Sequence, residues 1–157
     1  MAKILITYYS RSGNTEKMAT LIKEGVEKVT EDVELKKIEE TTIDDLLAAD
    51  AIIIGSPTYY GAMAAEIKTL LDKSVEYHGK FAGKIGGAFT SSANIGGGNE
   101  TTIMSILQAL LIHGMIIQGD SGGDHYGPVA IGAPDDRSKK ICLRYGKTVA
   151  TLAQRLK

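Results

Sequence analysis

The feature of this sequence that most constrains its fold is an alternation of short apolar runs with longer amphipathic stretches. Two of the runs, Lys3 to Tyr9 (KILITYY) and Ala51 to Gly55 (AIIIG), are rich in β-branched residues and have the length of buried strands. Thr15 to Val29, which follows the first run, has apolar residues at helical spacing with charged residues in between. Strands that alternate with helices in this way indicate a parallel sheet covered on both faces.

Over the whole chain, the pattern predicts five strands and five helices in strict alternation. We expect strands at Lys3–Tyr9, Val33–Ile38, Ala51–Gly55, Lys84–Ser91 and Met115–Gln118. We expect helices at Thr15–Val29, Ile43–Ala49, Ala62–Val75, Glu100–His113 and Asp136–Leu156. No repeat or linker interrupts them, so a single domain over residues 1–157 is expected. The predicted fold class is α/β, a doubly wound five-stranded parallel sheet in the order 2-1-3-4-5.

Composition narrows the classes of function. The chain has 18 Lys and Arg against 19 Asp and Glu, a formal net charge of -1, which argues against a nucleic-acid partner. Its one cysteine, Cys142, excludes an intrachain disulfide and a multi-cysteine metal site, and we expect it to be a small buried residue. No stretch of about 18 apolar residues is present. We therefore expect a soluble, cytoplasmic protein with no metal and no membrane partner.

The first strand is followed by a loop of small polar residues that leads directly into the first helix. Its sequence is Ser10-Arg11-Ser12-Gly13-Asn14-Thr15. The backbone amides at a helix start point outward and carry the positive end of the helix dipole, so a terminal phosphate suits this place. A tight turn with an N-cap is the alternative, although a cap needs only one Ser, Thr or Asn. Taken by itself, the loop leaves both interpretations open.

Several phosphate-binding proteins of this topology are excluded by motifs that are absent. There is no Gly-x-x-x-x-Gly-Lys-Ser/Thr for a nucleoside triphosphate and no Gly-x-Gly-x-x-Gly for a dinucleotide. A response-regulator domain needs acidic residues where strands 1 and 3 end, and these ends read Tyr8-Tyr9 and Gly55-Ser56. A low-molecular-weight tyrosine phosphatase needs a cysteine in the first loop, which has none.

Aromatic and glycine-rich loops follow strands 3 and 4. The first of these loops reads Ser56-Pro57-Thr58-Tyr59-Tyr60-Gly61-Ala62-Met63, and its adjacent tyrosines offer an aromatic face for a planar ring. The second reads Ser91-Ser92-Ala93-Asn94-Ile95-Gly96-Gly97-Gly98-Asn99, and its three glycines allow close approach of backbone N–H groups to a ligand. Either loop alone is weak support for a ligand, whereas three such loops on one sheet edge indicate a phosphorylated, planar ligand.

These residues resemble the flavodoxin superfamily over essentially the whole chain. The segment Ser10-x-Ser12-Gly13-Asn14-Thr15 is similar to the flavodoxin phosphate loop, and the other two loops are similar to those that flank the isoalloxazine ring. The segments YYSRSGNTEKMA, GSPTYYGAMAAEIKTLLD, GKIGGAFTSSANIGGGNETT, IHGM and GGDHYG more closely resemble the WrbA branch of FMN-dependent NAD(P)H:quinone oxidoreductases. WrbA proteins are longer, and electron-transfer flavodoxins usually stack a tryptophan on the flavin, whereas this chain has none.

The resemblance implies FMN as the cofactor and assigns its contacts. The implied FMN-binding residues are Ser10, Arg11, Ser12, Gly13, Asn14, Thr15, Pro57, Thr58, Tyr59, Tyr60, Gly61, Ser91, Ser92, Ala93, Asn94, Ile95, Gly96, Gly97, Gly98, His113 and Tyr126. For His113, a role at the end of its helix is an equal alternative. His125 and Tyr126 are candidates to edge the flavin or gate a substrate, and surface placement is expected for His78.

Two functions follow from the resemblance. The first is an electron-transfer flavodoxin that passes single electrons to redox partner proteins, in which Gly61 makes rotation of the Tyr60–Gly61 peptide toward the reduced flavin inexpensive. The second is an NAD(P)H:quinone oxidoreductase that transfers two electrons. In it, Arg11 would lie near the nucleotide phosphate, and the substrate slot would be shaped by Tyr59, Tyr60, His78 and His125. A flavin-free scaffold is a third alternative, and the oligomeric state is open.

Overall fold

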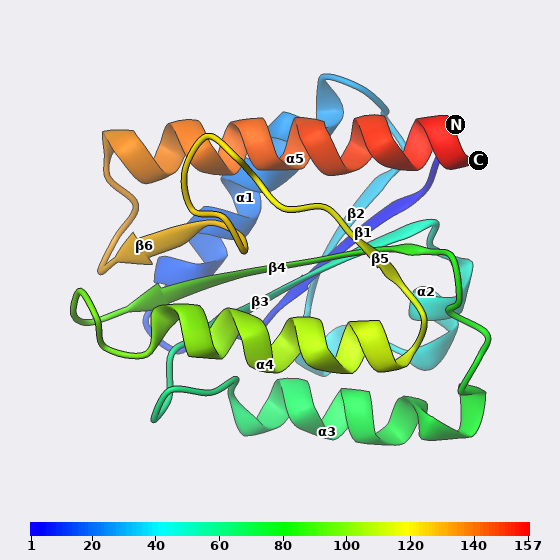
Figure 1. The fold of residues 1–157 in the computed structure, drawn as a ribbon, viewed down its shortest axis with the longest axis horizontal. Coiled ribbons are helices and arrows are strands. Elements are labelled where there is room, and N and C mark those ends of the chain that lie inside the picture. The colour runs from blue at the N-terminus through cyan, green and yellow to red at the C-terminus, as the bar shows by residue number, and fades with distance from the viewer.

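Six strands form one parallel sheet in the computed structural model, which describes residues 1–157 (Figure 1). They are β1 (Ile4–Tyr8), β2 (Val33–Lys37), β3 (Ala51–Pro57), β4 (Ile85–Ser92), β5 (Ile116–Ile117) and β6 (Val129–Ile131). The strand order β2-β1-β3-β4-β5 confirms the predicted order 2-1-3-4-5, with β6 as an additional strand beside β4. β2 is the outermost strand, and most of its residues are half-buried.

Helices cover both faces of the sheet, as Figure 1 shows. On one face lie α1 (Asn14–Glu27) and α5 (Asp136–Leu156), and on the other lie α2 (Ile43–Ala48), α3 (Ala65–Lys73) and α4 (Asn99–Ile112). Two 3₁₀ turns, η1 (Ile38–Glu40) and η2 (Ser74–Tyr77), complete the connections. Side chains of β1 alternate between the two faces, so that Ile4 and Ile6 pack under α1 and α5 while Leu5 packs in the opposite core.

One strand was expected at Met115–Gln118, but the structure has two short strands, β5 and β6, beside β4. β5 has only two residues and pairs with Ile85 and Gly86 at the start of β4. The end of β4 instead pairs with β6, in which Val129 lies opposite Thr90. Residues 118–128 therefore leave the sheet and return to it. The sequence did not reveal this, because a three-residue apolar run between Pro128 and Gly132 has no strand signal until β4 offers it a partner.

Element boundaries otherwise lie within a few residues of the prediction. The predicted helix Ala62–Val75 begins only at Ala65, because Ala62 forms an isolated antiparallel bridge with Tyr59. Cys142 is fully buried in α5, as expected of a small apolar residue. No helix of the structure is long and apolar enough to cross a membrane.

Candidate functional site

The three loops singled out in the sequence meet at the carboxyl ends of β1, β3 and β4. They enclose a cleft of about 420 Å³. Its lining contains Arg11, Ser12, Asn14 and Thr15 from the first loop, Pro57, Thr58 and Tyr59 from the second, Ser91, Ser92 and Ala93 from the third, and Gly132. Gly132 was not predicted, although it directly follows a strand in the same way as the other loops do.

The first loop leaves a group of backbone N–H donors without a protein acceptor. Ser10 acts as the local cap, because its Oγ accepts from the amides of Gly13 and Glu16, each at 3.2 Å. Gly13 has φ +95° and is followed by α1, which runs for 14 residues away from the cleft. In this loop, the N–H groups that have no bond within the protein belong to Ser10, Arg11, Ser12, Asn14 and Thr15. Donors collected at the positive end of a helix form an anion site, and a phosphate group fits them.

Hydroxyl groups tie the three loops together along the floor of the cleft. Thr15 Oγ1 and Ser91 Oγ are 2.9 Å apart, and both residues are buried. Thr58 N–H donates to the Ser91 carbonyl at 2.8 Å, and the hydroxyl oxygens of Thr58 and Thr90 are 2.9 Å apart. A ligand whose phosphate occupies the first loop therefore has a hydroxyl-lined surface beside it, which fits a polar linking chain.

The second loop is a tight turn with a fixed backbone. Tyr59 and Ala62 exchange two backbone hydrogen bonds, of 3.0 and 3.1 Å, and the two residues between them, Tyr60 and Gly61, have φ of +50° and +75°. Two successive positive φ angles are typical of a type I′ turn. The turn is held to α4, where Ser105 Oγ accepts from the Met63 amide at 3.1 Å. Tyr60 itself is fully exposed.

The third loop is closed at its base and open at its tip. Ser92 Oγ donates to the Asn94 carbonyl at 3.0 Å and accepts from the Asn99 side chain at 3.2 Å. At Gly98, where φ is +96°, a Cβ would lie 2.6 Å from the Gly61 Cα, so the second and third loops touch through glycine backbone. Residues 93–97, which form the tip of the loop, are exposed.

A second hollow, of about 800 Å³, lies behind the third loop and is here called the outer hollow. Its walls come from the tip of the third loop, the first turns of α4, residues 124–131 and the start of α5. Gly96, Gly98, His125, Tyr126 and Arg137 are among the residues that line it. The structure thus brings Tyr126 next to the third loop, as the sequence interpretation required of a residue at the flavin edge.

His113 and His78 lie at the opposite end of the sheet. His113 follows the last residue of α4, about 21 Å along the helix from the third loop. Its Nε2 is 2.7 Å from Ser74 Oγ, and its ring centroid lies 4.7 Å from that of Phe81 and 5.9 Å from that of His78. Within one chain, His113 therefore lies at the end of its helix and is not among the residues that line the cleft. The predicted topology could have shown this position of His113, because a helix that follows a parallel strand ends at the other edge of the sheet.

Carboxylates border the cleft on the side of β1. Tyr8 donates its phenol hydrogen to Glu16 at 2.8 Å. The pKa of Tyr8 is raised, mainly by burial and to a lesser extent by this hydrogen bond. Burial, and then the Glu66 carboxylate, raise the pKa of Tyr9. The rings of Tyr9 and Tyr59 meet edge to face with centroids 6.4 Å apart. The raised pKa values of Tyr8 and Tyr9 keep both phenols protonated near neutral pH.

Known proteins agree with this geometry. Residues 36–124 match the family described as NADPH-dependent FMN reductase. A flavodoxin from Aquifex aeolicus is 40% identical over 159 aligned residues, covering 96% of this chain and 86% of the relative. This chain belongs to the flavodoxin superfamily. Within the superfamily it is similar to an NAD(P)H dehydrogenase (quinone) from Sinorhizobium fredii, which is 37% identical and is aligned over 76% of this chain and 71% of the relative.

Solved structures of superfamily members have the same fold. A flavodoxin, WrbA-like protein from Agrobacterium tumefaciens superposes with a TM-score of 0.85 at 29% identity, over 100% of both chains. A flavodoxin from the domain Archaea has a TM-score of 0.82 at 28% identity and covers 97% of this chain and 99% of its own. A WrbA-like protein is thus among the solved structures that share this fold, in agreement with the resemblance of the loop sequences.

Proposed function

We propose that this chain is a flavodoxin that carries electrons on FMN. The observation that carries the proposal is the set of unbonded N–H groups of Arg11, Ser12, Asn14 and Thr15 at the start of α1. FMN is the cofactor of the superfamily to which the chain belongs, and its terminal phosphate matches these donors in charge and number. When bound, FMN supplies the redox chemistry, because it takes up and releases electrons singly or in pairs.

The cleft assigns a role to each of its three loops in this proposal. Ser10 to Thr15 would bind the phosphate, and Thr58, Ser91 and Ser92 would face the ribityl chain. The second loop, from Pro57 to Gly61, and the third loop, from Ala93 to Gly98, would hold the ring between them. Tyr126 would approach it from the outer hollow.

Comparison of FMN with riboflavin tests the phosphate anchor. The apoprotein is titrated with each compound while quenching of flavin fluorescence is followed. Because the two ligands differ only in the phosphate, FMN should bind at least about a hundredfold more tightly, which corresponds to about 2.7 kcal/mol. Equal affinities, or no binding of either compound, would contradict the proposal.

A second candidate function, a two-electron NAD(P)H:quinone oxidoreductase, is favoured by the backbone of Tyr60. Half a turn of the Tyr60–Gly61 peptide would convert the type I′ turn to type II′, in which glycine occupies the first central position. Tyr60 occupies that position and has a Cβ, so the rotation is disfavoured. Gly61 by itself would make the rotation inexpensive, but the rotation also changes the backbone conformation of Tyr60, and the Tyr60 Cβ opposes this. A peptide that keeps one orientation offers the same N–H to the ring before and after reduction, which suits transfer of electrons in pairs.

The variants Tyr60→Gly and Tyr60→Ala separate the two functions. In Tyr60→Gly the peptide is free to rotate, and we expect the two one-electron potentials of bound FMN to move apart by about 60 mV or more, a tenfold change in equilibrium. Tyr60→Ala also removes the ring but keeps the Cβ, and its potentials should stay as close together as those of the original protein. Equal separations in both variants would remove the argument from the turn. Anaerobic mixing with NADPH provides the direct assay, since rapid bleaching of flavin absorbance is expected only of the oxidoreductase.

The binding partners of the protein differ between the two proposed functions. An electron carrier would dock redox proteins at the flavin edge, and the oxidoreductase would take NAD(P)H and a quinone. We place the protein in the cytoplasm in this proposal. This is supported by Cys142, because burial raises the pKa of its thiol to about 12 and leaves it poorly suited to disulfide exchange.

A further inference from the structure

The outer hollow contains one side chain that the proposed function leaves unused, His125. It belongs to the segment 118–128, which leaves the sheet between β5 and β6. His125 is exposed and lines the hollow together with Gly96 and Gly98 of the third loop. The third loop is therefore shared, with the flavin cleft on one side and His125 on the other.

Hydrogen bonds fix the orientation of the His125 ring. Its Nδ1 is 2.7 Å from the Asp120 carbonyl oxygen, and the Asp120 amide donates to the His125 carbonyl at 3.0 Å. Because a carbonyl oxygen only accepts, Nδ1 carries the hydrogen of this bond. Nε2 has no hydrogen-bond partner in the protein.

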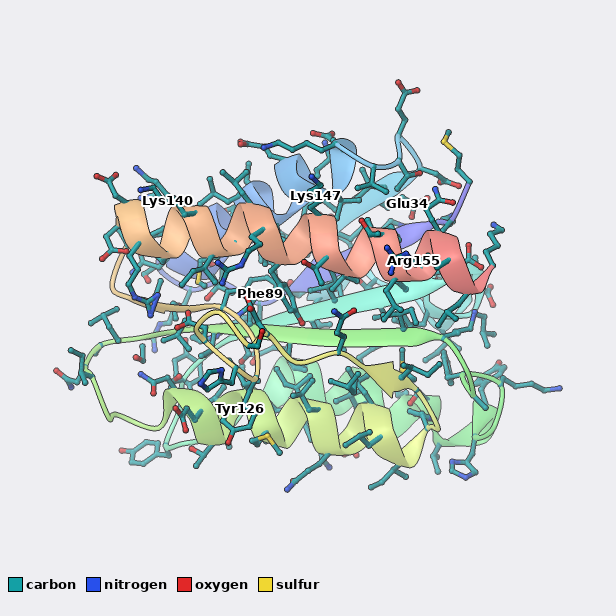
Figure 2. The ribbon with its side chains drawn as sticks, turned by 45° about the horizontal axis from the view of Figure 1, so that its top comes forward. Glu34, Phe89, Tyr126, Lys140, Lys147 and Arg155 are labelled. Atoms are coloured by element: carbon teal, nitrogen blue, oxygen red, sulfur yellow. The ribbon has the colours of Figure 1, made fainter.

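The segment that carries His125 is fastened to α5 at two points. Arg144 binds the Asp120 carboxylate through two nitrogens, the shorter distance being 2.6 Å. Arg137 donates to both carboxylate oxygens of Asp124, at 2.7 and 3.2 Å, whereas the two Arg144 nitrogens share Oδ2 of Asp120. Figure 2 shows the next residue, Tyr126, above α4, whose first turns form the opposite wall. His125 therefore has a defined position relative to the third loop.

The other charges around His125 do not change near neutral pH. Asp120 and Asp124 are neutralised by Arg144 and Arg137. Burial opposes ionisation of Asp120, but hydrogen bonds from the Gly122 amide and Arg144 outweigh it and lower the pKa of this carboxyl group. Glu100 from α4 and Asp135 from the start of α5 are the remaining charged groups of the hollow, and Tyr126 is its phenol. Histidine is the side chain type among these whose charge ordinarily changes between about pH 5 and 8.

We propose that His125 sets the reduction potential of the bound flavin through its charge, an inference that rests on the proposed FMN function. Protonated His125 places a positive charge behind the Gly96–Gly98 loop, and this charge favours the negative charge that the flavin site gains on reduction. Neutral His125 provides no such stabilisation. Protonation of His125 and reduction of the flavin are coupled, and each favours the other to the same extent. The effect is moderate because solvent reaches the hollow. When His125 is protonated, reduced FMN should gain about fivefold in affinity relative to oxidised FMN.

The test is the midpoint potential of the FMN-loaded full-length chain, measured against reference dyes with dithionite as reductant at about pH 5.5 and about pH 8.5. His125→Gln should have a lower potential than the original protein at the acid pH and the same potential at the alkaline pH. His125→Lys should keep the higher potential at both. The matched control is His78→Gln, which removes an exposed histidine from the far end of the sheet and should change nothing. About 0.3 M salt should reduce the difference, since exposed charges are screened.

Equal potentials of the original protein and His125→Gln at the acid pH would overturn the proposal, as would a matching shift in His78→Gln. Arg144→Met adds a check on position, because it releases Asp120 and should weaken the effect of His125 without abolishing FMN binding. Failure of the proposed function is distinguishable, since the original protein would then bind no FMN and would yield no flavin signal. Bound FMN with a potential indifferent to His125 overturns this inference alone.

Discussion

The two ends of the sheet both gather polar side chains, but they use them in opposite ways. At the amino ends of the strands, charged side chains find partners within the protein. Lys84 Nζ donates to the Leu47 carbonyl at 2.8 Å, and Asp50 accepts from the Lys3 amide at 2.7 Å and from Lys157 at 2.9 Å. These bonds hold the ends of the connections together, and a hollow of about 350 Å³ at this end is lined by the same Asp50, Lys84 and Lys157.

At the carboxyl ends of the strands, donors are left without partners. Ser10 caps two amides, yet four further amides between Arg11 and Thr15 have no acceptor. An unpaired N–H group is unfavourable unless water or a ligand takes its bond. Polar composition by itself therefore does not mark the site, since both ends have it. The donors that the fold leaves unsatisfied are what distinguish the site.

The largest effect should come from a negative charge placed among these donors. Ser12→Asp puts a carboxylate where the phosphate would sit, and we expect the dissociation constant of FMN to rise by at least about a hundredfold, because like charges repel in a partly enclosed site. Thr69→Asp adds the same charge on the exposed face of α3 and should leave the affinity unchanged. Fluorescence titration measures both. Similar losses in the two variants would mean that net charge, and not the loop, governs binding.

A smaller effect is expected where the second and third loops touch. In Gly98→Ala the new Cβ would lie 2.6 Å from the Gly61 Cα, so the loops must separate, and the affinity for FMN should fall by about tenfold. Gly96→Ala is the control in the same loop. Its φ is also positive, at +66°, but no atom lies within 4 Å of the new Cβ, so only backbone strain of about 1 kcal/mol is expected. If both variants bind FMN equally well, contact between the loops is not needed to form the site.

The smallest effect is expected at His113, where a substitution should change the free energy of unfolding but not the affinity for FMN. Burial, and then His78, lower the pKa of His113, and its buried Nδ1 has no partner that could accept a second hydrogen. In the unfolded chain, the imidazole of residue 113 takes up its second proton at about pH 6.5. The contribution of His113 to stability is therefore complete above that pH and is lost as the pH falls below it. His113→Gln should show a weaker loss of stability between about pH 7.5 and 5.5 than the original protein. Urea unfolding at both pH values measures this.

The same variant tests the contrast between the two ends of the sheet. At about pH 7.5, His113→Gln should bind FMN as tightly as the original protein, because residue 113 lies one helix length from the cleft. Weaker FMN binding with unchanged stability would return His113 to the site and contradict the placement described above.

Much of the fold was accessible from the sequence because periodicity reports local environment. The β-branched run Lys3–Tyr9 and the amphipathic stretch Thr15–Val29 indicate a buried strand and a covering helix wherever they occur. The doubly wound rule then places the three loops on one edge. β6 was missed, since Val129–Ile131 becomes a strand only through its pairing with the end of β4.

The site was predicted as a set of loops but not as a geometry. The positive φ of Tyr60 could not be predicted from its residue type, because it depends on the two hydrogen bonds between Tyr59 and Ala62. Nor did the sequence show that Gly132 reaches the cleft, since that position follows from the unforeseen β6. In each case the missing information was a pairing between residues whose partners are chosen by the folded backbone.

The sequence by itself determined the order of strands and helices, the position of the three loops and the chemical character of each, because these depend on residue types along a contiguous segment. Tertiary structure decided which N–H groups remain free, that the Tyr60–Gly61 turn is fixed, and that His113 and His125 lie at opposite ends of the sheet. The physical reason is that satisfaction of a donor and the distance between two side chains depend on segments that are remote in the chain and are brought together only by folding.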